Sequence, residues 1–410
     1  MLDVWVTPHV VGSLDRHSRE AGASTFAYRS AIQPGEDVSL TMPWSLESYR
    51  YQNGLHPVFQ MNLPEGRLRE SIELSFRKRV KGFDALSLLE VVGRSQIGRL
   101  RFANDPGVID QVPLQSVSEL IAYDGSEELL IDLLERFSTV SGVSGVQPKV
   151  LIRDGVHGEG EAFAQSRVTV KGATHIVKGW NRNEYPHLAA NEFFCMNAAR
   201  RSGLEVPEFT LSENNQLLVV KRFDRTEEGE YLGFEDFCSL NGIGTAEKYD
   251  GSYEKLGKRI RQFVSPELQA SALEVYFRSL TLSCIVRNGD AHLKNFGVLY
   301  TASNKPVRLA PAFDIVSTTA YIKKDTLALT LDGSKRFPAA KKLIAFAKMH
   351  CNLQPSKAKL IIEEVADAVA ETVAGLRQHT LDFADFKSVG EAMLSEWKEG
   401  LTAIGQNKGE

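Results

Sequence analysis

The sequence predicts an α+β fold in which a β-rich N-terminal part is followed by an all-helical C-terminal part. Short runs with strand composition, separated by Gly, Pro and Asp turns, occupy residues 1 to about 105. From Tyr231 onward the pattern is helical, and residues 339–404 are nearly all helical, with Gly390 as the expected break. With 410 residues the chain is too long for one simple core, so we expect two or three packed units.

Composition and charge narrow the class of protein. Hydrophobic residues make up 43% and charged residues 24% of the chain, which is typical of a globular protein and not of a disordered one. The net charge of −4 gives the whole chain no signature of a nucleic-acid binder, although a local basic patch is allowed. The four cysteines form no C-x-x-C pair, which argues against a disulfide framework or a zinc site. No run approaches the ~20 apolar residues that span a bilayer, and no signal peptide is recognisable, so we expect a cytoplasmic protein.

The chain divides into three expected parts: residues 1–105, a β-rich subdomain; residues 106–225; and residues 226–410, the helical part. Nothing in the first part suggests catalysis, so we expect it to serve as a scaffold or docking surface. Its expected elements are strands at residues 2–6, 24–28, 38–40 and 97–102 and helices at residues 67–81 and 84–92, with Asp84 as an N-cap.

Small residues and glycines fill residues 138–149, directly before a strand expected at 150–152. Because a glycine has no Cβ, backbone N–H groups in such a loop can come close to phosphate oxygens. The loop matches neither the Walker A motif nor G-x-G-x-x-G, and a plain hairpin turn would have a similar sequence. The hydroxyls of Ser138, Ser141 and Ser144 could be modified.

Two further strands carry charged residues at their ends. Lys178 ends an apolar strand; burying an unpaired ammonium group is costly, so Lys178 either pairs with a phosphate and a carboxylate or lies in solvent at an edge. Glu192, on the helix expected at residues 186–202, could be its partner or a surface glutamate. The strand at residues 216–220 runs into a polar connector, where the backbone of residues 219–221 would face adenine and Asp224 would approach the ribose. The alternative is an ordinary charged strand end.

The densest cluster of reactive groups lies between an apolar helix and a short strand, in residues 287–297. Asp290 and Asn295 stand five apart, as in the H-R-D-x-x-x-x-N loop of protein kinases, where Asp accepts the proton of the nucleophile and Asn holds Mg²⁺. His292 and Lys294 lie between them. Asp314 follows 24 residues after Asp290 in an apolar frame, the place of the second metal-binding Asp in kinases. The alternatives are a polar turn and a helix N-cap.

Together these features occur in kinase order, which predicts a two-lobed kinase-like fold. The chain also resembles the HipA toxins, serine/threonine kinases of bacterial type II toxin–antitoxin modules, in six motifs: residues 144–149 (SGVQPK), 175–178 (HIVK), 221–225 (KRFDR), 235–238 (EDFC), 288–296 (NGDAHLKNF) and 313–314 (FD). Residues 1–105 resemble the N-terminal subdomain that full-length members carry.

The resemblance implies roles for these residues. Asp290 would be the catalytic base, His292 and Lys294 would steady the loop or the transferred phosphoryl group, and Asn295 and Asp314 would bind Mg²⁺. The residues expected to bind ATP are Val146, Gln147, Lys149, Lys178, Val219, Val220, Lys221, Phe223 and Asp224. The regulatory serine of the family falls on Gly142 here, so autophosphorylation is assigned to Ser141 or Ser144.

The resemblance also implies partners. Members bind a helix-turn-helix antitoxin of the HipB kind, which would connect this chain to DNA only indirectly. Their substrates include aminoacyl-tRNA synthetases, whose phosphorylation halts growth. Two other functions compete with this one: a small-molecule kinase of the aminoglycoside or choline type, and a pseudokinase that acts only as a binding partner or co-repressor.

Overall fold

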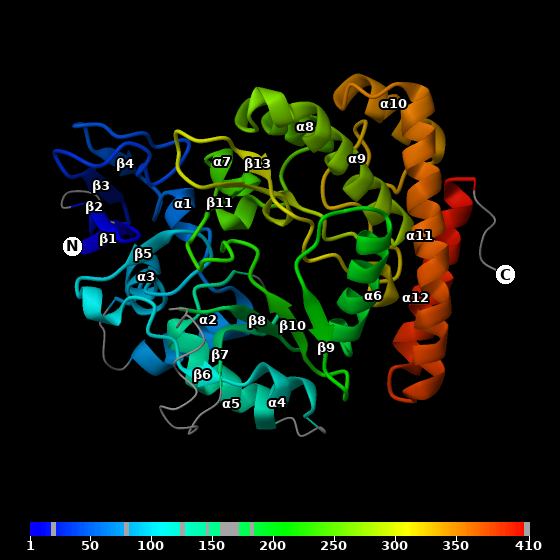
Figure 1. Ribbon diagram of the computed structural model, residues 1–410, viewed down its shortest axis with the longest axis horizontal. Coiled ribbons are helices and arrows are strands. Elements are labelled where there is room, and N and C mark those ends of the chain that lie inside the picture. The colour runs from blue at the N-terminus through cyan, green and yellow to red at the C-terminus, as the bar shows by residue number, and fades with distance from the viewer. Residues whose placement is uncertain are drawn as a thin grey trace. The chain divides into compact units, whose positions relative to one another are not determined.

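The computed structural model describes residues 1–17, 22–77, 82–123, 128–144, 147–155, 172–180 and 184–405. By packing, the chain falls into two compact units, each built from segments far apart in the sequence. The first unit holds Met1–Gly179, Glu208–Thr245 and Leu299–Pro306, and the second holds Trp180–Pro207, Ala246–Val298 and Val307–Glu410. Their helices and strands are labelled in Figure 1.

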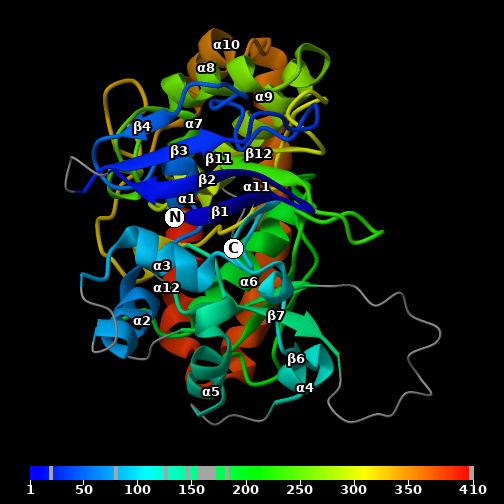
Figure 2. The same ribbon diagram turned by 90° about the vertical axis from the view of Figure 1, so that its left-hand side faces the viewer.

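The N-terminal part of the first unit is built on a five-stranded sheet of order β4-β3-β2-β1-β5, of which β1 to β4 are labelled in Figure 2. These strands are β1 (Leu2–Val6), β2 (His9–Arg16), β3 (Ser24–Tyr28), β4 (Tyr49–Tyr51) and β5 (Leu100–Phe102). Burial alternates along β1, because successive side chains point to opposite faces and only one face packs on the core. The strands predicted at residues 2–6 and 24–28 are therefore confirmed, and β2 is an additional strand.

The strand predicted at residues 38–40 is wrong. That segment forms only an isolated bridge between Ser39 and Met42. Its polar groups are satisfied by a buried side chain: the Ser39 hydroxyl and the Leu40 amide donate hydrogen bonds of 2.5 and 2.8 Å to the carboxylate of Glu235. A segment whose hydrogen bonds go to a side chain has no need of a strand partner.

Three helices share a core with this sheet: α1 (Pro57–Gln60), α2 (Gly66–Arg77) and α3 (Ala85–Val92). The helix predicted from Asp84 to residue 92 is confirmed together with its cap, since the Asp84 carboxylate accepts the Ser87 N–H at 2.8 Å. Apolar side chains of the helices and strands form one buried cluster, in which Phe26, Phe59 and Phe102 are the largest members.

The second sheet of the first unit has the order β6-β7-β8-β10-β9. It consists of β6 (Leu114–Gln115), β7 (Lys149–Asp154), β8 (His175–Lys178), β9 (Phe209–Leu211) and β10 (Leu218–Lys221), with α4 (Val117–Ile121) and α5 (Glu128–Phe137) nearby in sequence. Val150, Leu151 and Ile152 are all fully buried, so β7 is a central strand covered on both faces. The unit also contains β11 (Gly233–Asp236) and α7 (Phe237–Leu240).

The second unit is mainly helical, which confirms the predicted α+β class with a helical C-terminal part. Its helices are α6 (Leu188–Arg201), α8 (Tyr253–Phe263), α9 (Gln269–Ile285), α10 (Ala340–His350), α11 (Pro355–Asp382) and α12 (Lys387–Ala403). The long helix α11 packs against α6, α9, α10 and α12, and its full length is visible in Figure 1. Two short strands, β12 (Gly297–Tyr300) and β13 (Arg308–Leu309), follow the predicted catalytic loop.

The helix break predicted at Gly390 is wrong. Gly390 lies inside α12. A Cβ at this position would come within 2.2 Å of Thr380 Oγ1 on α11. The glycine is therefore a close-packing position between two helices, and the breaks fall at residues 351–354 and 383–386. Among the residues that the structure describes, no helix is long and apolar enough to cross a membrane.

Candidate active site

The predicted catalytic loop begins where α9 ends, in the second unit. Arg287 follows the helix with φ at +59°, in the left-handed region that a non-glycine residue enters only at a cost. The Asn288 amide then donates back to Ser283 O at 2.8 Å, and the Asn288 side chain accepts the Asp290 amide at 2.9 Å. These two bonds turn the chain out of the helix and fix the backbone of Asp290.

The predicted site residues of the loop lie close to one another. The Asp290 side chain is 43% exposed, and its Oδ1 lies 3.8 Å from Nε2 of the buried His292. The His292 backbone N–H donates to Asn295 Oδ1 at 3.2 Å across the short 3-10 turn Leu293–Asn295. Lys294, in that turn, is buried. His292 therefore contacts both the candidate base and the candidate metal ligand.

Hydrogen bonds on both sides of Asp314 tie its segment to the catalytic loop. Before it, the Ala310 amide donates to Gly297 O at 2.9 Å, which places residue 310 beside the strand that leaves the loop. After it, Thr318 Oγ1 accepts the Gly289 amide at 2.7 Å and lies 3.3 Å from Arg287 O. Asp314 is held between these two attachments.

The backbone of Asp314 is strained, with φ at +54°. Non-glycine residues in this region cost of order 1–3 kcal/mol and persist only where the surrounding structure enforces them. Arg287 shares this conformation, but so do six other described non-glycine residues, among them Asn215 and Asn352. Positive φ is therefore not confined to the candidate site, and the role of Asp314 stays a prediction.

Asn295 and Asp314 fit a magnesium ion by their chemistry. Both offer hard oxygen ligands, and Mg²⁺ in nucleotide sites is bound by one or two protein oxygens together with substrate phosphates. The amide oxygen of Asn295 accepts one backbone hydrogen bond, which leaves its second lone pair for a cation. Within the described ranges no group of three or more His, Cys, Asp or Glu side chains that could hold a metal ion is found.

In the first unit, two predicted phosphate-binding lysines lie side by side. Lys149 on β7 and Lys178 on β8 are register partners of an antiparallel pair, and each is only 4% exposed. Both side chains also interact with other groups of the protein, so phosphate binding by these lysines stays a prediction. Gln147 reaches the same strand end, because its Nε2 donates to Gly179 O at 3.0 Å. Val146 lies outside the described residues.

The residues predicted to meet adenine lie on a central strand. β10 is flanked by β8 and β9, and Val219 pairs with Val177 on one side and Thr210 on the other. The backbone groups of Val219 and Val220 are thus used by the sheet, while the Lys221 side chain forms an exposed ion pair of 2.8 Å with Glu208. Phe223 packs its ring on Phe234. Adenine contacts at these residues stay a prediction.

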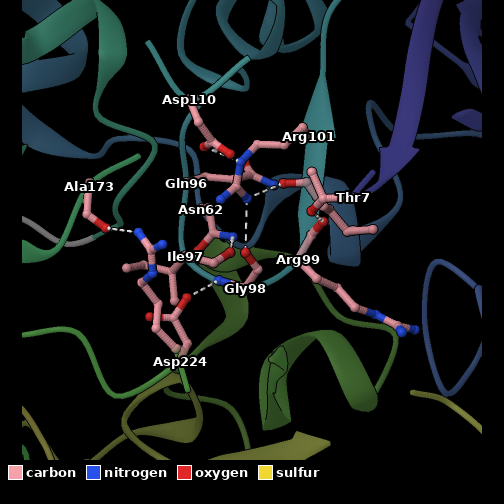
Figure 3. Close-up of polar contacts among 12 residues, drawn as sticks. Thr7, Asn62, Gln96, Ile97, Gly98, Arg99, Arg101, Asp110, Ala173 and Asp224 are labelled. Atoms are coloured by element: carbon pink, nitrogen blue, oxygen red, sulfur yellow. Dashed lines mark hydrogen bonds and ion pairs between the residues drawn. The ribbon is translucent and has the colours of Figure 1, made fainter. Parts of the chain in front are cut away.

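Asp224 has strong partners within the protein, as Figure 3 shows. Its side chain is 1% exposed and forms a two-pronged ion pair with Arg222, at 2.9 and 2.5 Å, and it accepts the Gly98 amide at 2.6 Å. Burial alone would raise the pKa of Asp224, but the charge of Arg222 and these hydrogen bonds outweigh it, so the pKa is lowered. This carboxylate connects the turn at Gly98 to the end of β10. Its predicted contact with ribose stays a prediction.

The predicted autophosphorylation sites are hydrogen-bonded in different ways. Ser141 is fully buried, and its Oγ donates to Phe137 O at 2.7 Å and accepts the Leu151 amide at 2.8 Å. Ser144 is half-buried and donates to Glu65 at 2.5 Å. Phosphorylation of Ser141 would therefore require its segment to separate from β7. Phosphorylation of Ser144 would require only that its hydrogen bond to the Glu65 carboxylate breaks.

One residue at the site was missed by sequence reasoning. Tyr249 lies in a segment that the sequence marks only as a loop, yet its hydroxyl donates to Asp290 Oδ1 at 2.6 Å. Forty residues separate Tyr249 from Asp290, so no local sequence pattern connects the two. The local sequence offers only the two tyrosines, Tyr249 and Tyr253, on either side of Gly251 as a signal.

Comparison with known proteins identifies the family of the chain. The HipA N-terminal domain matches residues 2–103, and the HipA-like C-terminal domain matches residues 141–373, more than half of the chain. Protein Y4dM of Sinorhizobium fredii, a candidate kinase, is 30% identical over 402 residues, which cover 92% of this chain and 90% of Y4dM. The serine/threonine-protein kinase toxin HipA of Shewanella oneidensis is 26% identical over 403 residues, which cover 90% of this chain and 89% of that toxin.

A solved structure shows the same fold. In the complex of Shewanella oneidensis MR-1 HipA with HipB and operator DNA, a chain superposes with a TM-score of 0.69 at 20% identity, covering 100% of this chain and 99% of that one. The two family models match in the order N-terminal domain, then C-terminal domain, over residues 2–103 and 141–373. The chain belongs to the HipA family.

Proposed function

We propose that this protein is an ATP- and Mg²⁺-dependent serine/threonine kinase that serves as the toxin of a toxin–antitoxin module. The observation that supports the proposal is the arrangement in the second unit, where Asp290 and Asn295 stand on one loop and hydrogen bonds at residues 310 and 318 attach the segment that carries Asp314. Membership of the HipA family supports the same chemistry.

The reaction transfers the γ-phosphoryl group of ATP to a hydroxyl of the acceptor. The acceptor oxygen forms a bond to the γ-phosphorus, the bond from that phosphorus to the β,γ-bridging oxygen breaks, and ADP leaves with the electron pair. Asp290 orients the acceptor hydroxyl and takes its proton. Lys149 and Lys178 supply positive charge for the phosphates. Bound Mg²⁺, held by Asn295 and Asp314, would neutralise the charge that develops on the phosphoryl oxygens.

The partners follow from the relatives. The solved Shewanella oneidensis HipA is in a complex with HipB and operator DNA, so we propose a HipB-like antitoxin for this chain and contact with DNA through that antitoxin. As the substrate we propose a translation component such as an aminoacyl-tRNA synthetase, whose phosphorylation would arrest growth.

The test is incubation of the purified protein with labelled ATP and Mg²⁺ in bacterial extract, followed by mass-spectrometric identification of the labelled product. Label on serine or threonine of one extract protein supports the proposal. Label on a small molecule would point to the aminoglycoside type of kinase. Absence of both ATP consumption and label would leave a pseudokinase, and the Asp290→Asn variant serves as the matched control.

A further inference from the structure

Tyr249 contacts the candidate catalytic base directly. Its hydroxyl donates a hydrogen bond of 2.6 Å to Asp290 Oδ1. The distance is at the short end of the range for a hydroxyl donor and is typical of a bond to an ionised acceptor. Tyr249 is 41% exposed and Asp290 is 43% exposed, so this bond forms at the surface where a macromolecular acceptor would have to arrive.

The ring of Tyr249 is itself fixed in place. It packs edge-on against His292 of the catalytic loop, with ring centroids 5.0 Å apart and an interplanar angle of 73°. From its own segment, the Lys248 ammonium lies 5.5 Å from the centre of the same ring. Contacts on two sides hold the phenol toward Asp290, so the hydroxyl is a built feature of the site.

The segment that carries Tyr249 is also attached to the backbone of the catalytic loop. Lys248 O accepts the Leu293 amide at 3.2 Å, and the buried Tyr253 donates its hydroxyl to Ala291 O at 3.0 Å. Burial raises the pKa of Tyr253, which keeps it a neutral donor. Residues 248–253 thus form hydrogen bonds with Asp290, Ala291 and Leu293 of the loop.

From this arrangement we infer that Tyr249 is a positioning residue for the base Asp290, an inference that rests on the proposed kinase function. The terminal torsion of an aspartate is broad, so a half-exposed carboxylate does not by itself keep one orientation. The Tyr249 hydroxyl holds Oδ1 and thereby sets the plane in which the carboxylate meets the acceptor hydroxyl. Small displacements of a catalytic group lower the rate strongly, so this bond affects the chemical step more than ATP binding.

The experiment compares the full-length protein with its Tyr249→Phe variant, which removes one hydroxyl and keeps the ring on His292. Tyr185→Phe is the matched control, because Tyr185 lies in the same unit, is 38% exposed and has its ring against Tyr321 rather than against His292. Initial rates of label transfer from ATP to protein in bacterial extract are measured over a range of ATP concentrations. ATP affinity by calorimetry and the melting temperature are measured in parallel.

We expect Tyr249→Phe to lower the maximal rate about tenfold, with the KM for ATP, the calorimetric affinity and the melting temperature unchanged, and Tyr185→Phe to match the unchanged protein. A rate that stays the same overturns the inference. A rate that rises also overturns it, since Tyr249 would then be occupying the place of the acceptor. If the protein without substitutions transfers no label at all, the proposed function is wrong, and the inference about Tyr249 is wrong with it. If both variants transfer label at the normal rate, only the inference about Tyr249 is wrong.

Discussion

The amide of Gly289 donates a 2.7 Å hydrogen bond to the hydroxyl of Thr318, and this bond joins the catalytic loop to the segment that follows Asp314. The Thr318 hydroxyl also donates to Asp325 Oδ2 at 2.5 Å. The approach is close because residue 289 has no side chain: a Cβ there would lie 2.1 Å from Asp325 Oδ2 and 2.6 Å from Thr326 O. The loop that carries Asp290 and the segment that follows Asp314 are therefore joined at a position where only glycine fits.

Gly289→Ala should destabilise the protein by about 1–3 kcal/mol, because the new methyl group must displace a carboxylate and a backbone carbonyl. Gly375→Ala is the control: Gly375 lies in α11, and a Cβ there would have its nearest neighbour at 4.0 Å. That substitution should stabilise the helix by about 0.5–1 kcal/mol. Thermal unfolding of both variants shows whether the two substitutions change the melting temperature in opposite directions. Equal changes in melting temperature would contradict the close contact at Gly289.

Asp290→Asn should leave ATP binding largely intact and lower phosphoryl transfer by about 10²–10⁴-fold, because an amide of the same shape cannot accept the proton. The Asn oxygen can still accept the Tyr249 hydroxyl, so the loop geometry is kept. Calorimetry with Mg²⁺-ATP and mass spectrometry of the protein after incubation measure the two effects separately. Autophosphorylation retained at the normal rate would exclude Asp290 as the base.

Asp314→Ala and Asp314→Gly should both weaken Mg²⁺-ATP binding, since each removes the carboxylate. They should differ in stability: at φ +54° an alanine keeps the left-handed strain, whereas glycine relieves about 1–2 kcal/mol of it. The glycine variant should therefore melt higher than the alanine variant while binding ATP equally poorly. Unchanged calorimetric affinity in either variant would refute a metal-binding role for Asp314.

Lowering the pH should destabilise the N-terminal part through His56. Burial lowers the pKa of His56 from 6.5 to about 4, and its Nδ1 accepts the Val58 amide at the start of α1. The unfolded state therefore binds the proton more readily: His56 contributes its full stability above pH 6.5, and that contribution is lost as the pH falls toward 4. The total loss is about 3 kcal/mol.

The control for His56 is His56→Asn, which keeps an N-cap acceptor but does not titrate. Denaturant unfolding between pH 7 and pH 4 should show a flatter pH dependence in this variant. An identical slope in the two proteins would assign the pH dependence to other groups.

Asp224→Ala should lower the free energy of unfolding by about 3–5 kcal/mol, because it leaves the fully buried Arg222 without its counter-charge. Asp224→Asn, which retains an acceptor for the Gly98 amide, should cost less. Thermal unfolding and ATP titration of both variants separate this structural role from the predicted ribose contact. A variant with normal stability and weaker ATP binding would favour the ribose contact.

The local parts of the site were readable from the sequence for a physical reason. Asp290 and Asn295 stand on one short turn, so their spacing alone carries the geometry, and Asp84 caps α3 through a residue three positions away. Strands at residues 2–6 and 24–28 were equally predictable, because alternating burial is written into consecutive residues.

Features that depend on distant residues were not readable in this way. Gly390 was expected to end a helix, since glycine is a poor helix former, but close packing on Thr380 keeps it inside α12. Residues 38–40 have strand composition, but the buried carboxylate of Glu235 takes their hydrogen bonds. In both places a tertiary contact overrides the local preference.

The sequence by itself therefore determined the α+β class and the family, and it predicts a catalytic loop from Arg287 to Gly297, because these follow from residue types at short spacing. Only the tertiary structure decided that Asp314 is held beside that loop, that Asp224 is bound by Arg222 and Gly98, and that Tyr249 contacts Asp290. Arg222 lies only two residues from Asp224, but the other partners stand 24 to 126 positions apart. No periodic pattern in a single chain encodes contacts over such separations.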